Sequence, residues 1–307
     1  MGKRADRREA PKRAPRQRLS KSARHVKWGS SLFIAPSFLG FLLFFLLPFL
    51  VVIVYSVVEN PFNMRFVGLE NFRQVIQNKA FQTAVSNTAR FSVIAVPLSV
   101  VLSLLLAVVL EAKIPFRTQF RTFFLSPMMV PVASIVLIWQ VLFHDNGAVN
   151  DVILALGGQK IDWMKSEHAI VVIVILFLWK NLGYNMILFM AALASVPRDI
   201  LEVARLESAT PLQIFFHIKI RYLSATILFV TIMSLISSFK IFREIYLLTS
   251  DYPFDTLYML QHYMNNKFRN LDYQALSAAA ILMSLVMIVI IGAMFFVENY
   301  FGKDVEG

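Results

Sequence analysis

The amino-acid sequence predicts an all-α membrane protein with six transmembrane helices. Hydrophobic residues make up 57% of the 307 residues and charged residues only 16%, which is far from the composition of a soluble domain. Six apolar runs have the length that a spanning helix needs, about 20 residues. Because none of the runs alternates apolar and polar residues as barrel strands do, we expect helices throughout.

The six expected spans follow one another along the whole chain after a basic start. They cover residues 29–58, 91–110, 122–143, 169–196, 222–239 and 273–297. The first three contain no charged residue, the fourth contains only Lys180, and Lys240 directly follows the fifth. An even number of spans places both termini on the same side of the membrane.

The orientation of these spans follows from the distribution of Lys and Arg. Residues 1–28 hold 11 Lys or Arg against Asp6 and Glu9, so this segment supplies +9 of the chain's net +11. Cytoplasmic flanks carry the excess of positive charge, and we therefore expect cytoplasmic N- and C-termini. We interpret residues 1–28 as a basic disordered cytoplasmic tail near lipid headgroups, rather than as a nucleic-acid arm. Residues 29–307 form the expected transmembrane domain.

Several kinds of chemistry are excluded by the residues present. The chain has no Cys, which rules out disulfides and Cys-based metal sites. The five His residues fall in tails or at the ends of spans, and neither H-E-x-x-H nor G-x-S-x-G occurs, so we do not expect an intramembrane enzyme. The chain also lacks G-x-x-x-x-G-K-[ST], which predicts that it does not itself hydrolyse ATP.

The segment between the fourth and fifth spans, "EVARLESATPLQIFFHIKI" at 202–220, is charged and interrupted by a proline. The topology makes it a cytoplasmic loop, about residues 197–221. Pro197 suits the first turn of a helix, and "TPLQ" predicts a capping box in which Thr210 and Gln213 cap each other's backbone. We expect two helices joined by a bend at residues 208–210, the second running into the fifth span. The first is short and amphipathic, which favours docking of a soluble partner over lying on the bilayer.

This loop resembles the EAA loop of ATP-binding-cassette (ABC) importer permeases, in which Glu-Ala-Ala is followed by three residues and a glycine. Glu202, Val203 and Ala204 stand at the Glu-Ala-Ala, and Ser208 stands at the glycine. At the closing element, Ile220-Arg221 replaces the usual Leu-Pro. The resemblance implies that the loop couples to an ATPase subunit, and the residues at the matching positions are Glu202, Val203, Ala204, Glu207, Ser208 and Ala209.

Almost the whole chain is similar to the sugar-type branch of these permeases. The matching stretches occur in the usual order, at residues 33–56, 67–72, 85–110, 116–143, 178–204 and 239–249. The Gly-Gly-Pro that usually follows Thr249 is missing, because the chain continues "SDYP" and keeps only Pro253. The resemblance implies the type I ABC importer permease fold.

The resemblance also implies a function and a set of partners. The chain would be a multi-pass permease subunit in the cytoplasmic membrane, forming half of the pathway for a sugar or related polyhydroxylated solute. Its partners would be a second permease, two cytosolic ABC ATPase subunits that use ATP-Mg, an extracellular solute-binding lipoprotein or periplasmic protein, and membrane lipids. The chain itself would bind no cofactor or metal. Two alternatives stay open: an anionic solute such as a glycerol phosphate, and a channel or receptor module without ATPase coupling.

Polar residues within the spans are the candidates for the solute path, because such residues are costly when they face lipid. The candidates in the fourth span, and at the end of the fifth, are Lys180, Asn181, Tyr184, Asn185, Ser237, Ser238, Lys240 and Arg243. Their amides, hydroxyls and phenol suit a polyhydroxylated solute. Two other interpretations remain: Ser and Asn also join helices to one another, and Lys240 can neutralise Glu244 one turn away.

Overall fold

The structure is a computed structural model that describes residues 34–112 and 114–301. The basic tail at 1–28, the start of the first expected span and the last six residues lie outside the described residues. The chain divides into two compact units within its first long helix, with residues up to Val51 in one unit and residues from Val52 in the other. All contacts discussed below belong to the second unit.

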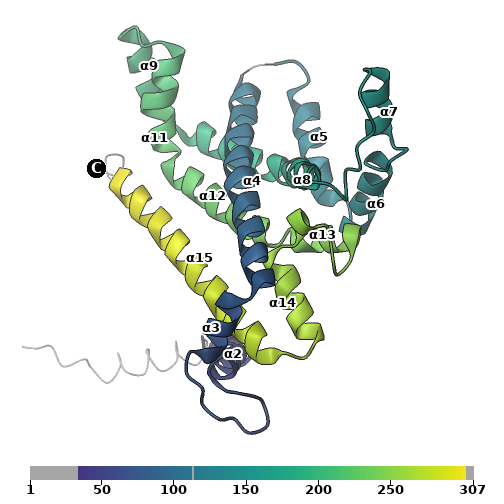
Figure 1. The fold of residues 1–307 in the computed structure, drawn as a ribbon. Coiled ribbons are helices and arrows are strands. Elements are labelled where there is room, and N and C mark those ends of the chain that lie inside the picture. Colours follow the sequence, from purple (N-terminus) through teal and green to yellow (C-terminus); the bar gives the residue numbers. More distant parts are fainter. Residues whose placement is uncertain (1–33, 113, 302–307) are drawn as a thin grey trace, which may run out of the picture. The chain divides into compact units, whose positions relative to one another are not determined.

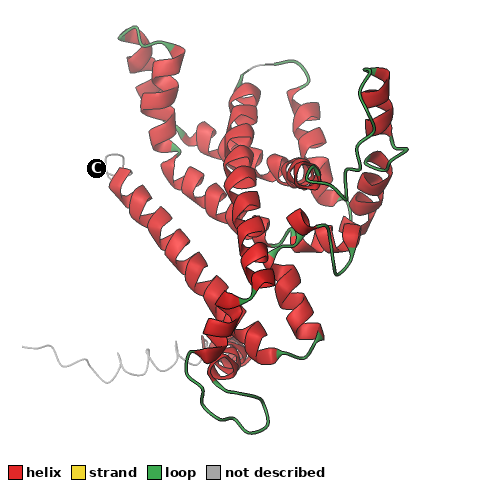
Figure 2. Cartoon of the chain, viewed as in Figure 1, coloured by secondary structure: helices red, strands yellow, loops and turns green. Residues whose placement is uncertain are grey.

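The described residues are helical and contain no β-strand, as Figure 2 shows, which confirms the predicted fold class. Most of the helices are labelled in Figure 1. Their bounds are η1 Leu42–Leu46, α2 Leu47–Val57, α3 Glu70–Gln77, α4 Lys79–Glu111, α5 Arg117–Met129, α6 Val132–Leu142, α7 Ala148–Ala155, α8 Ala169–Ser195, α9 Arg198–Leu206, α10 Pro211–Gln213, η2 Ile214–Lys219, α11 Ile220–Tyr222, α12 Ser224–Phe239, α13 Phe242–Thr249, η3 Asp255–Leu257, α14 Leu260–Arg269 and α15 Tyr273–Phe301.

Among the described residues, five helical segments are long and apolar enough to cross a membrane. They are Ile34–Val57, Lys79–Glu111, Ala169–Ser195, Ser224–Thr249 and Tyr273–Asn299. A sixth candidate is the pair formed by α5 and α6, which is bent by 102°. By length and composition the structure therefore holds five candidate spans, or six if the bent pair counts as one.

The prediction of one continuous third span over residues 122–143 is wrong. The helix ends at Met129 and a second begins at Val132. Val130 is extended, as a residue before proline usually is, and Pro131 is the N-cap of α6 with a φ of −58°. Pro131 has no N–H to continue the helix, so the chain turns at this point.

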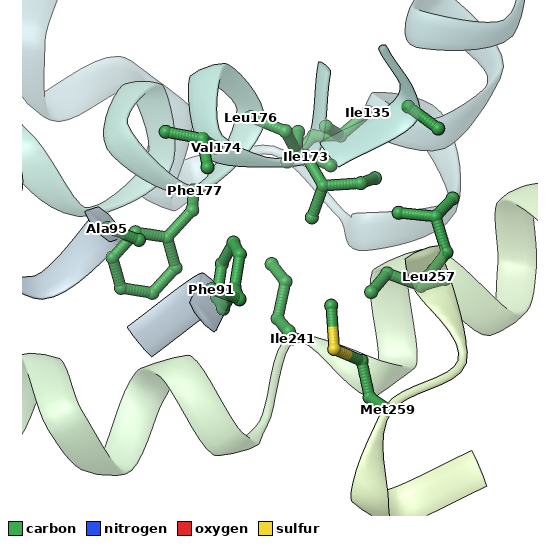
Figure 3. Close-up of a cluster of buried hydrophobic side chains, with 12 residues drawn as sticks. Phe91, Ala95, Ile135, Ile173, Val174, Leu176, Phe177, Ile241, Leu257 and Met259 are labelled. Carbon is green, nitrogen blue, oxygen red and sulfur yellow. The ribbon is translucent and has the colours of Figure 1, made fainter. Parts of the chain in front are cut away.

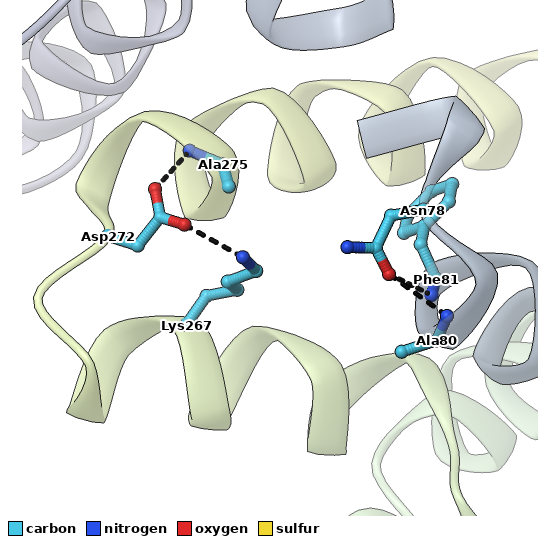
Figure 4. A network of polar contacts seen from close by, with 6 residues as sticks. All are labelled: Asn78, Ala80, Phe81, Lys267, Asp272 and Ala275. Carbon is cyan, nitrogen blue, oxygen red and sulfur yellow. Dashed lines mark hydrogen bonds and ion pairs between the residues drawn. The ribbon is translucent and has the colours of Figure 1, made fainter. Parts of the chain in front are cut away.

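The second candidate span begins earlier than the sequence predicts, at Lys79 instead of Phe91. Asn78 sets this start, because its side-chain oxygen accepts hydrogen bonds from the N–H groups of Ala80 and Phe81 at 2.9 and 3.3 Å (Figure 4). Figure 4 also shows the ion pair between Lys267 of α14 and Asp272, at 2.8 Å, which joins α14 to the start of α15.

The core of the second unit is built on α4 and α8, which pack against each other along their lengths. In the cluster drawn in Figure 3, Phe91 of α4 meets Phe177 of α8 edge to face, with ring centroids 5.5 Å apart. Ile241 and Ile245, at the start of α13, close the same cluster. This core fixes α8, the helix that carries half of the predicted solute path.

At Gly183, α8 lies directly against the backbone of α5. A Cβ atom at Gly183 would overlap the backbone carbonyl of Phe124 and lie 3.1 Å from the backbone nitrogen of Leu125. Small residues at such crossings let two helix backbones approach in a membrane. The close contact at Gly183 thus fixes the part of α8 that carries Lys180, Asn181, Tyr184 and Asn185.

Ser250 occupies a backbone conformation that glycine usually provides. It ends α13 with φ 66° and ψ −155°, a region that side chains other than glycine's rarely adopt. It directly follows Thr249, where the resemblance described above implies a Gly-Gly-Pro. Serine therefore adopts at this turn a conformation that glycine adopts with less strain.

His262 of α14 is fully buried outside the candidate spans. Its Nδ1 accepts a hydrogen bond from the N–H of Met259 at 3.2 Å, and its ring meets Phe242 edge to face at 4.6 Å. Its Nε2 has no hydrogen-bond partner among the described residues. Burial lowers the pKa of His262 from 6.5 to about 4, so the imidazole is neutral at pH 7.

We expect the folded protein to lose stability as the pH falls from 6.5 towards 4. Over this range the unfolded chain binds a proton at residue 262 and the folded chain does not, so the loss reaches on the order of 3 kcal/mol near pH 4. Thermal unfolding of the purified protein in detergent should show it. His262→Gln should flatten the pH dependence, whereas the same change at exposed His217 should not. If the melting temperature of His262→Gln depended on pH as the wild type's does, His262 would not be the cause of the loss of stability.

Candidate functional site

The predicted coupling loop forms two helical segments joined by a bend, as the sequence predicts. The first, α9, begins after Pro197, and the second begins at Pro211 and continues through η2 and α11 to Tyr222. The capping box of Thr210 is present: its hydroxyl accepts from the N–H of Gln213 at 3.3 Å, and the Gln213 side chain accepts from the N–H of Thr210 at 2.8 Å. After a short break at Leu223, α12 begins the candidate span Ser224–Thr249.

Ser208 makes the bend with a left-handed backbone, at φ 61°. The N–H of Ser208 donates to the carbonyl of Arg205, and the N–H of Ala209 donates to the carbonyl of Ala204, both at 3.0 Å. This pair of bonds is the Schellman closure of a helix end, which glycine usually provides. Serine therefore adopts here the positive φ that glycine reaches with less strain, because the closing hydrogen bonds hold the residue in place.

We expect Ser208→Gly to stabilise the loop. The left-handed conformation costs serine about 1–2 kcal/mol, and glycine's greater freedom in the unfolded chain returns about half of that, which leaves a gain of about 0.5–1 kcal/mol. The melting temperature of the purified protein measures it. Ser86→Gly is the control, since Ser86 is exposed within the helix α4 and its replacement should lower the melting temperature. A lower melting temperature for Ser208→Gly would contradict the claim that the positive φ of Ser208 is strained.

Most residues of α9 and the bend are exposed. Glu202, Val203, Glu207 and Ser208 are exposed, while Ala204 and Ala209 are partly covered. Val203 and Leu206, one turn apart on α9, are apolar side chains with 54% and 84% of their surface exposed. Val203 and Leu206 together form the exposed apolar face of α9.

The coupling loop is tied to the rest of the chain by an ion pair. Lys219, at the end of η2, binds Glu111, at the C-terminal end of α4, with a distance of 2.6 Å between the Nζ and Oε2 atoms. A displacement of the loop would therefore act on α4 as well as on α12. The sequence did not indicate Glu111, because 108 residues separate the two partners.

Two of the predicted solute-path residues lie between helices. The amide of Asn185 is buried and donates to the hydroxyls of Ser99 on α4 and Ser234 on α12, both at 3.0 Å. Ser238 is also buried and shares a hydrogen bond with Ser92 of α4 at 2.8 Å. These contacts join α4, α8 and α12, so Asn185 and Ser238 act as polar contacts between helices.

Glu244 of α13 forms its ion pair with Lys180 of α8 and not with Lys240. The predicted alternative, in which Lys240 neutralises Glu244 one turn away, is therefore wrong: Lys240 is exposed and Glu244 turns towards α8. The sequence could not indicate this pair, because its partners are 64 residues apart. The remaining candidates, Asn181, Tyr184, Ser237, Lys240 and Arg243, are partly or fully exposed.

The comparisons with known proteins agree with this arrangement. Residues 99–307, more than half of the chain, match the family described as binding-protein-dependent transport system inner membrane component. The chain belongs to this family. It is thus a multi-pass transmembrane permease component of a binding-protein-dependent transport system.

Curated relatives of the permease span most of its length. The arabinooligosaccharides transport system permease protein AraP of Bacillus subtilis is 29% identical over 71% of each chain. The lactose transport system permease protein LacF of Rhizobium radiobacter is 30% identical, over 89% of this chain and 93% of its own. Both relatives are named as permease proteins of transport systems.

A solved structure has the same fold. The permease superposes on a chain of a bacterial alginate ABC transporter, crystallised in complex with an alginate pentasaccharide-bound periplasmic protein, with a TM-score of 0.79 and 19% identity. The match covers 94% of this chain and 99% of the other. The predicted fold of a type I ABC importer permease is therefore confirmed.

Proposed function

We propose that this permease forms half of the translocation pathway of an ATP-driven ABC importer for a sugar or a related polyhydroxylated solute. Separate cytosolic ATPase subunits, which use ATP-Mg, would supply the energy, and a second permease would complete the pathway. An extracellular binding protein would deliver the solute at the cytoplasmic membrane. The solute class rests on two relatives whose names specify lactose and arabinooligosaccharides. A third relative, UgpA of Pectobacterium atrosepticum, is 27% identical over 85% of this chain and is named for sn-glycerol-3-phosphate.

The observation that carries the importer proposal is the geometry of the coupling loop. A rigid helix, α9, ends in a Schellman closure at Ser208 and presents the exposed apolar face of Val203 and Leu206. The second segment of the loop leads almost without interruption into α12. A partner that moved α9 would therefore move a candidate span, which is what conversion of ATPase closure into alternating access needs.

The face that α8 exposes supports a hydrophilic pathway. Lys180 lies near the middle of α8, and Tyr184 follows one turn later with 38% of its surface exposed. Asn181 lies beside them and is partly exposed. Polar groups at this depth face an aqueous cavity or another protein, since facing lipid is costly. We propose Lys180, Asn181, Tyr184, Ser237, Lys240 and Arg243 as the lining residues.

The test is expression of the permease with the subunits encoded beside it, followed by purification and transport measurements in liposomes. We expect ATPase subunits to co-purify, and uptake of labelled neutral sugars to require both ATP and the binding protein. Glu202→Ala, which removes an exposed carboxylate from α9, should reduce uptake while leaving the permease folded. Uptake without ATP, or a complete complex without an ATPase subunit, would refute the proposal and favour a channel or receptor module.

A further inference from the structure

The ion pair between Lys180 and Glu244 is asymmetric. The side chain of Glu244 is 3% exposed, whereas that of Lys180 is 32% exposed. The carboxylate is therefore enclosed between α8 and α13, and the ammonium lies at the edge of the open face of α8. A carboxylate buried at this depth is retained only with a charged partner, because an unpaired charge in the membrane interior is costly.

The surroundings explain why Glu244 stays in this place. Its neighbour Ile245 is fully buried in the core cluster of Phe91 and Phe177, and so is Ile241. These two side chains fix the start of α13, which fixes the carboxylate against α8. Lys180 is held from the other side by α8, whose position depends on the close crossing at Gly183. The pair is thus set by two rigid elements and not by a loop.

We propose that Glu244 determines the charge preference of the solute path by neutralising Lys180. This inference rests on the proposed function. With the pair intact, the middle of α8 offers the solute a hydroxyl and an amide, from Tyr184 and Asn181, but no uncompensated charge. The pair therefore lowers the attraction of this part of the path for an anionic solute by the one charge of Lys180, while Lys240 and Arg243 keep theirs.

Two other cations lie on the same stretch of chain. Lys240 and Arg243 are exposed at and beside the junction of α12 and α13. They are the charged neighbours of Glu244 along its own segment, and they stay the same in every variant considered below. A comparison between variants therefore isolates the charge that Glu244 compensates.

Glu244→Gln should leave the ammonium of Lys180 without a charged partner. Glutamine has nearly the same size as glutamate, so the packing at residue 244 should be retained. A unit charge within about 10 Å of an anionic solute changes its affinity by on the order of tenfold at an effective dielectric constant near 20. We expect the affinity for anionic sugars, relative to neutral ones, to rise by that factor. The rise should shrink as salt is raised from about 0.05 to 0.5 M, because freed charges near water are screened.

The experiment measures solute-induced thermal stabilisation of the purified transporter complex, so that the selectivity of the binding protein does not enter. The probes are matched pairs of neutral sugars and their C6 uronic acids, galactose and galacturonate among them. The control is the double variant Lys180→Gln/Glu244→Gln, which removes both charges and should keep the wild-type preference. It also shows whether loss of the ion pair by itself disturbs folding.

The outcomes separate this inference from the proposed function. A wild-type complex that responds to neutral sugars, together with an unchanged preference in Glu244→Gln, would overturn the role of Glu244 alone. An equal gain of anion affinity in the double variant would overturn it as well, because that variant has no freed ammonium. A wild-type complex that neither responds to nor transports any neutral sugar would instead refute the proposed solute class.

Discussion

Replacement of Gly183 by valine is expected to prevent α5 from packing on α8 and to leave little folded permease. The new Cβ atom would overlap the backbone carbonyl of Phe124, and a backbone atom cannot turn away as the end of a side chain can. The two helices must move apart, which costs about 3 kcal/mol or more, at the upper end of the range for overpacked cores. The yield of monodisperse protein and its melting temperature in detergent measure the effect.

A matched control exists on α15. Gly292 is also a helical glycine, but a Cβ atom built there has no atom within 4 Å. Gly292→Val should therefore change the melting temperature little, because it adds a side chain to an open surface. Equal losses in the two variants would show that the damage comes from valine in a helix and not from the crossing of α5 and α8.

Most of the helices could be predicted from the sequence, because long apolar runs leave few other structures in a membrane. The exceptions have local causes. The second span begins at Lys79 because Asn78 caps it, although the hydrophobic pattern starts only near Phe91. The third expected span is broken at Pro131, and a count of apolar residues could not show that break.

The coupling loop was predictable in outline because its signals are local. Pro197 and the capping box of Thr210 lie within a few residues of the helix ends that they define. The positive φ of Ser208 was not predictable, since it depends on which carbonyls close the end of α9. The roles of Asn185 and Lys180 depend on partners in other helices, Ser99 and Glu244, and no pattern within α8 could indicate them.

Replacement of Leu206 by aspartate is expected to weaken the proposed docking of the ATPase subunits on α9 and so to reduce ATP-driven uptake. Leu206 is 84% exposed on α9, next to Val203, and a large apolar side chain at the centre of a docking surface commonly contributes 2 kcal/mol or more to binding. An aspartate at this position would remove the apolar contact with the partner, and its carboxylate would have to lose its water when the partner binds. We expect the ATPase subunits to dissociate during purification and uptake to fall about thirtyfold, which corresponds to about 2 kcal/mol.

The folding of the permease itself should be unaffected, because a side chain so exposed contributes little to its core. Leu156, which follows α7, is the matched control: it is 82% exposed and lies in a segment that the charge distribution places outside the cell. Leu156→Asp makes the same chemical change on an equally exposed leucine and should retain both the ATPase subunits and uptake. If Leu206→Asp also retained them, α9 would not be the docking helix, and the coupling role of Glu202 to Ala209 would have to be abandoned.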